Sequence, residues 1–203
     1  MNKTKVSFYV FGDSHARFNM TNFSKDHYNF SVNSITMFRA GRDNELLGFS
    51  KDMISFDNTF IFFYGEIDAR AHVHRQIMAG RVLEDIVEEL TSNFMRTIKN
   101  NITSYKKIII GSITPSLRRS DYEDTWGPIT HEWPMIGTDI ERVLYTKLLN
   151  ASLKKKSNDL GFIFLDVFND YSREDGTLQF EKSDGICHIK DNSLLLEKLD
   201  SLL

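Results

Sequence analysis

Cysteine, net charge and long apolar runs are all scarce in this chain of 203 residues. The single cysteine, Cys187, excludes an intrachain disulfide and is typical of a protein from a reducing compartment. A formal net charge of -3 gives no basic surface for nucleic acid or for an anionic membrane. No apolar run approaches the roughly 20 residues that span a bilayer. We therefore expect a cytoplasmic protein without nucleic-acid or membrane partners.

The N-terminus and the overall composition indicate an ordinary globular chain. The first apolar run is short and leads straight into Gly12 rather than a small-residue cleavage site, so we expect no signal peptide. The fractions of 41% hydrophobic and 26% charged residues are usual for soluble domains. No repeat, low-complexity tract or linker interrupts the sequence. These features predict a single domain over residues 1–203.

Apolar runs and helical periodicity alternate along the chain. The runs predict five strands, at Val6–Phe11, Tyr28–Ile35, Thr59–Tyr64, Lys106–Ile113 and Phe162–Phe168. Helical patterns occupy Arg70–Lys99 and Thr138–Leu160, where Thr138 and Glu141 form a capping box and the inward residues are expected to be Ile140, Val143, Leu144 and Leu148. The alternation predicts a three-layer α/β/α sandwich, flavodoxin-like, around a parallel sheet in the order 2-1-3-4-5.

The end of the first predicted strand carries the strongest chemical signal. Ser14 follows Gly12 and Asp13 there, and open α/β sheets place their chemistry at the carboxyl ends of strands. Ser14 is therefore a candidate nucleophile. The structural alternative is that Asp13 and Ser14 only cap the segment that follows.

A serine hydroxyl needs a neighbouring base to become a good nucleophile. His188 follows the last predicted strand, and Asp184 stands four residues before it. That spacing would put both side chains on one face of a helical turn, where Asp184 could orient the imidazole toward Ser14. The alternative is a turn at Asp184 and an ordinary surface position for His188.

Three short motifs resemble those of the SGNH/GDSL hydrolases. Gly12–His15 (GDSH) resembles the first block of that family, Gly65–Asp68 (GEID) resembles the third block, Gly-x-Asn-Asp, and Asp184 with His188 resembles the fifth. The motifs come in the family's order along the whole chain. The resemblance implies a Ser14–His188–Asp184 triad that works through an acyl-enzyme and needs no metal or cofactor. It also implies that the backbone N–H groups of Ser14 and Gly41 bind the oxyanion, with Gly41 in a turn-forming segment at Thr36–Asn44.

The chain departs from the family pattern at two places. Ile67 replaces the third-block asparagine, and the loss of one oxyanion donor typically costs roughly 10²–10³ in rate. Arg70 and His72 follow closely and are the candidate substitutes. The fifth block holds one more residue between Asp184 and His188 than the usual Asp-x-x-His.

Other residues near these motifs are candidate substrate contacts, namely Asp13, His15 and Glu66. A His72–His74 metal site is rejected, because residues two apart on a helix do not share a face. The segment Thr114–Gly137 shows no sustained periodicity and follows a central strand. Its side chains either wall the substrate site or fasten a long loop to the core; they include Tyr122, Trp126, His131 and Trp133.

The expected function is that of a serine hydrolase acting on a small-molecule or glycan ester, such as a carbohydrate O-acetyl group. Two alternatives stay open. One is an O-acyltransferase with the same triad. The other is a catalytically silent SGNH-like domain that binds a glycan or a partner protein.

Overall fold

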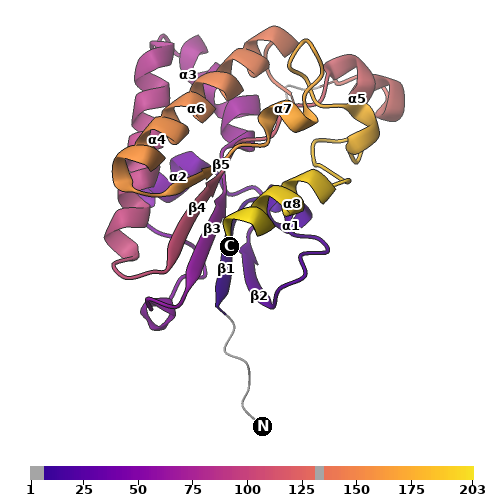
Figure 1. Ribbon diagram of the computed structural model, residues 1–203. Helices are drawn as coiled ribbons and strands as arrows, with labels where there is room; N and C mark the ends of the chain where they lie inside the picture. The colour runs from indigo at the N-terminus through magenta and orange to yellow at the C-terminus, as the bar shows by residue number, and fades with distance from the viewer. Residues whose placement is uncertain (1–6, 131–134) are drawn as a thin grey trace.

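The computed structural model describes residues 7–130 and 135–203, and within them five parallel strands form one sheet (Figure 1). The strand order is β2-β1-β3-β4-β5, so the predicted topology is confirmed. The strands are β1 (Phe8–Gly12), β2 (His27–Ser31), β3 (Thr59–Phe63), β4 (Lys107–Gly111) and β5 (Ile163–Leu165).

Helices cover both faces of this sheet, which makes the three-layer α/β/α sandwich expected from the sequence. Figure 1 shows α2, α4 and α6 on one side of the sheet and α1 and α8 on the other. The helical segments are α1 (Ser14–Asn19), α2 (Met37–Asp43), η1 (Lys51–Met53), η2 (Asp68–His72), α3 (Val73–Met78), α4 (Leu83–Asn101), α5 (Arg119–Trp126), α6 (Asp139–Leu160), α7 (Phe168–Tyr171), η3 (Phe180–Lys182) and α8 (Ser193–Leu202). Within the described ranges, no helix combines the length and apolar character needed to cross a membrane.

Strand β3 lies at the centre and is buried along its whole length, as its sequence predicts. Alternate side chains of a strand point to opposite faces. Phe60 and Phe62 accordingly pack into the core beneath α2, α4 and α6, while Ile61 and Phe63 pack into the core beneath α1 and α8. Each buried side chain of this size contributes about 1.5–3 kcal/mol, so the central strand is a rigid base for the loops at its carboxyl end.

Helix α6 shows where periodicity misleads. The capping box of Thr138 and Glu141 is present and Val143 is buried as expected, but Ile140 is 83% exposed and Leu144 is exposed as well, so half of the expected inward face is wrong. The buried face instead includes Asn150, whose side-chain amide donates to Ile113 O and accepts from Ile113 N. A polar residue with both of its hydrogen-bonding functions satisfied is stable in a core, and hydrophobic spacing does not reveal it.

Two segments expected to be irregular contain helices. Helix α2 occupies most of the predicted turn at Thr36–Asn44, and Thr36 caps it by accepting from Arg39 N. Helix α5 lies inside the segment Thr114–Gly137. Both helices are short, seven and eight residues, which leaves too few turns for a periodic pattern to stand out.

Candidate active site

Ser14 opens helix α1 directly after strand β1, at the carboxyl edge of the sheet. The strand ends on Gly12 because a Cβ there would lie 2.1 Å from Phe63 O of β3, so only glycine allows the two strands to approach. Asp13 caps α1 and accepts from His15 N at 2.8 Å. The capping role expected for Asp13 is therefore present, and it fixes the turn that presents Ser14.

The structure brings Ser14, His188 and Asp184 together. Ser14 Oγ lies 2.8 Å from His188 Nε2, and His188 Nδ1 lies 2.6 Å from Asp184 Oδ2. The Asp184 and His188 side chains are 18% and 12% exposed, which leaves the pair partly shielded from water but open to a ligand. This is the arrangement in which a carboxylate orients an imidazole toward a serine hydroxyl.

Asp184 and His188 meet across a tight loop and not on the helical turn expected from their spacing. Asp184 Oδ1 accepts from the backbone N–H groups of Ile186, Cys187 and His188 at 2.9–3.0 Å, and Asp184 N donates to His188 O. These bonds close the loop on itself, so the residue inserted relative to the family spacing does not separate the two side chains.

The surroundings favour an ionised Asp184 that holds His188. Burial opposes ionisation of Asp184, but the bonds from the His188 ring and from the loop backbone outweigh it and hold the Asp184 pKa far below its usual range. Burial likewise lowers the pKa of His188, but the bond with Asp184 outweighs burial and raises that pKa above 6.5. Phe18, one helical turn after Ser14, stacks on the His188 ring with centroids 4.0 Å apart and planes at 11°. The ring plane of His188 is thus fixed from one side.

A buried network of charged side chains lies beneath this pair. His15 Nδ1 lies 3.1 Å from Asp13 Oδ1, and Glu66 Oε1 accepts from Arg70 Nε at 2.7 Å. Burial favours neutral His15, but Asp13 and Glu66 outweigh it and raise the His15 pKa well above its usual value. These four side chains are buried and contact one another, and their roles as substrate contacts stay predictions.

No family model and no curated protein matches this chain. Solved structures match over nearly its whole length. One is a GDSL-like lipase from Bacteroides thetaiotaomicron, with 12% sequence identity and a TM-score of 0.57 over 99% of this chain and 91% of that one. Phospholipase A1 from Streptomyces albidoflavus has 13% identity and a TM-score of 0.52 over 97% of this chain and 99% of that one. The OSK domain of Drosophila Oskar has 12% identity and a TM-score of 0.55 over 98% of this chain and 88% of that one. The chain has the SGNH/GDSL-hydrolase fold.

One expectation drawn from the SGNH/GDSL pattern is wrong. Gly41 lies inside helix α2, where a Cβ would meet Asn93 of α4 at 2.8 Å, and helical N–H groups bond to carbonyls one turn earlier. Its N–H is therefore not offered to an oxyanion. Ser14 N–H, in contrast, is in the first turn of α1, where helices leave their N–H groups without intrahelical partners.

The third-block segment, Gly65–Asp68, also holds the start of helix α2 in place, a role that the sequence did not reveal. Asp68 accepts from Met37 N at 2.6 Å and from Phe38 N at 3.1 Å, and so joins the segment after β3 to the start of α2. Burial raises the pKa of Asp68 to about 7, although these two bonds oppose the rise. Ile67 precedes it, is buried, and has no donor to replace the family asparagine.

Of the remaining candidate residues, Trp126 contacts the loop that carries His188, whereas His72 contacts helix α2. Trp126 is 58% exposed and donates from Nε1 to Gly185 O at 2.8 Å, which ties α5 to the loop that carries His188. His72 stacks on Phe38 of α2, and its role as a substitute oxyanion donor stays a prediction. His131 and Trp133 lie outside the described residues.

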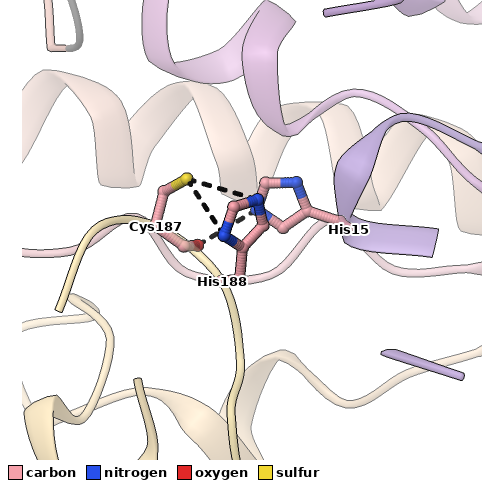
Figure 2. A group of neighbouring side chains, drawn as sticks. All are labelled: His15, Cys187 and His188. Atoms are coloured by element: carbon pink, nitrogen blue, oxygen red, sulfur yellow. Dashed lines mark hydrogen bonds between the residues drawn. The ribbon is translucent and has the colours of Figure 1, made fainter. Parts of the chain in front are cut away.

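Cys187, the free cysteine of the chain, is buried beside two histidines of the site. Its Sγ lies 3.7 Å from both ring nitrogens of His188, and its carbonyl oxygen lies 3.0 Å from His15 Nε2 (Figure 2). In the sequence only His188 adjoins Cys187, since His15 is distant along the chain and approaches Cys187 only in the folded protein.

Proposed function

We propose that this protein is a serine ester hydrolase in which Ser14 is the nucleophile, His188 the base and Asp184 the orienting carboxylate. The observation that carries the proposal is the continuous pair of short contacts from Asp184 Oδ2 to His188 and from His188 Nε2 to Ser14 Oγ, at 2.6 and 2.8 Å. Structural neighbours described as a lipase and a phospholipase support the ester class.

The reaction begins when His188 Nε2 takes the Ser14 proton as Ser14 Oγ attacks the ester carbonyl. The carbonyl oxygen becomes an oxyanion, and Ser14 N–H donates to it. His188 then returns the proton to the leaving alcohol, which leaves an acyl group on Ser14. Water, deprotonated by the same imidazole, releases the acid and restores the serine. No step requires a metal or cofactor.

We expect a lower kcat than that of an SGNH hydrolase with a full set of oxyanion donors. The Gly41 N–H lies inside helix α2, and the Ile67 side chain has no donor. The absence of the asparagine donor alone predicts a rate lower by roughly 10²–10³.

The substrate class that fits the rim is a short acyl ester of a polar alcohol, such as an O-acetyl group on a carbohydrate. The exposed Trp126 ring is held beside the His188 loop by its bond to Gly185 O. A flat aromatic surface with a polar edge suits the face of a sugar ring. An O-acetylated sugar would stack there while its acetyl group reached Ser14.

A panel of short acyl esters tests this function. Ser14→Ala and His188→Ala are expected to lower kcat by at least about 10⁴-fold, because the residues of a triad act as a unit. Ser201→Ala, on the exposed face of α8, is the matched control and should keep full activity. Full activity in Ser14→Ala would overturn the mechanism. Product analysis with added sugar alcohols separates hydrolysis from acyl transfer by the same residues.

A catalytically silent binding domain is the second candidate, and Ile67 is the observation that favours it. The OSK domain of Oskar shows that the fold also occurs in a domain not described as a hydrolase. A silent domain would hydrolyse none of the esters in the panel, and substitution of Ser14 would leave its affinity for a glycan or protein partner unchanged.

A further inference from the structure

The Cys187 side chain lies beside two imidazole rings at the candidate active site. One ligand atom from each of His15, Cys187 and His188 lies within 4.8 Å of the other two (Figure 2). Cys187 and His188 come from the loop after η3, and His15 comes from α1, so the fold assembles the group from both ends of the chain.

Both imidazoles are held in the orientation that metal-binding histidines use. His15 Nδ1 lies 3.1 Å from Asp13 Oδ1, and His188 Nδ1 lies 2.6 Å from Asp184 Oδ2. A carboxylate at Nδ1 fixes the ring and leaves Nε2 as the ligating atom, which is how zinc-bound histidines are usually held.

Bonds of about 2.3 Å to sulfur and 2.0–2.1 Å to nitrogen place two ligand atoms of a tetrahedral zinc ion about 3.6 Å apart. Cys187 Sγ lies 3.7 Å from each nitrogen of His188 and therefore sits beside the ring, not along the Nε2 lone pair. Closing the group around an ion therefore requires the Cys187 side chain to rotate about its Cα–Cβ bond toward His188 Nε2, while Asp184 keeps the His188 ring in place. Glu66 Oε2 lies 3.7 Å from His15 Nε2, is buried and has no hydrogen-bond partner among the described residues, so it is available as a fourth, negatively charged ligand.

We propose that His15, Cys187 and His188 bind a zinc-class divalent cation that switches the active site off. A thiolate and two imidazoles select zinc over magnesium or calcium, which prefer oxygen ligands. The ion displaces the thiol proton and the contact of His15 Nε2 with Cys187 O, and the released protons go to solvent. It also occupies His188 Nε2, which then no longer accepts from Ser14. This inhibition rests on the proposed hydrolase function, whereas the binding itself does not.

Binding is tested with Co²⁺ and Zn²⁺ on Ser14→Ala, a chain that binds without turning over. We expect one equivalent of Co²⁺, a thiolate-to-cobalt charge-transfer absorption in the near ultraviolet, and loss of that absorption when Zn²⁺ is added. Cys187→Ser should lose the absorption, and His15→Gln should weaken Co²⁺ binding by at least about tenfold. His27→Gln, on strand β2, is the control and should bind as the parent does. A folded Ser14→Ala chain without the absorption would overturn the proposal.

Inhibition is tested on the unmodified chain with the best ester of the panel. Zn²⁺ should abolish hydrolysis, EDTA should restore it, and Cys187→Ser should need at least about tenfold more Zn²⁺ for the same loss, relative to its own activity in EDTA. Equal Zn²⁺ sensitivity of both chains would place the inhibitory ion elsewhere and overturn the proposal. Cobalt binding without ester hydrolysis would leave the metal site standing and remove only the hydrolase function.

Discussion

Replacing Asp184 with asparagine separates the two functions of its carboxylate. Oδ1 accepts from three backbone N–H groups of the loop, and Oδ2 contacts His188 Nδ1. An asparagine that keeps its oxygen on the loop must turn its NH₂ group toward Nδ1. A donor there requires an Nδ1 without a proton, so the proton moves to Nε2. His188 then donates to Ser14 and can no longer act as its base.

The expected loss in kcat for Asp184→Asn is about 10³–10⁴-fold, the size seen when a triad histidine is held in the wrong tautomer. The pH profile should change as well. His188 is active only when neutral, so activity in the parent chain rises with pH through a His188 pKa that Asp184 holds above 6.5. Without the carboxylate that pKa falls, and the residual activity should begin at lower pH.

The assay is kcat and kcat/KM for p-nitrophenyl acetate across the acid and neutral range, with thermal unfolding of each variant. Asp191→Asn is the matched control, because Asp191 accepts from Ser193 at the start of α8 and should leave the profile unchanged. An Asp184→Asn chain that keeps activity within a few-fold, with the same acid limb, would refute the assignment of Asp184 to His188.

Three further results are expected. Glu66→Gln should destabilise folding by about 3–5 kcal/mol in urea titrations, because it removes the buried carboxylate that compensates the Arg70 charge; an unchanged midpoint would contradict this. Ile67→Asn should raise kcat by up to about 10²-fold if a third-block donor is what the site lacks, and no gain on the ester panel would show that another group serves. Phe18→Leu should lower kcat and shift the acid limb to lower pH, since the imidazolium of His188 loses an aromatic face, whereas Phe18→Tyr should keep both values.

The fold followed from the sequence because its strands are encoded by short apolar runs. Two of these strands, Thr59–Phe63 and Lys107–Gly111, are buried nearly throughout. Short apolar runs of this kind, separated by helical patterns, are typical of the buried strands of a parallel sheet. The inward face of α6 followed only in part, because Asn150 is buried there through two bonds to Ile113. Only the tertiary partner makes that position favourable.

The positions of Ser14 and His188 could also be inferred, since both follow strands of one parallel sheet. What the sequence did not reveal depends on local backbone geometry. Gly41 suggested a turn, but it is the residue without a side chain that lets α2 approach α4 at Asn93. The path of the loop from Asp184 depends on three hydrogen bonds to one oxygen, which spacing alone does not specify.

The most direct test of the central claim is peptide mapping after treatment with a fluorophosphonate, which reacts with activated serines. Stoichiometric modification at Ser14 that disappears in His188→Ala is the result expected from the contact between Ser14 Oγ and His188 Nε2. A folded chain that stays unmodified, or that carries the adduct at another serine, would contradict it.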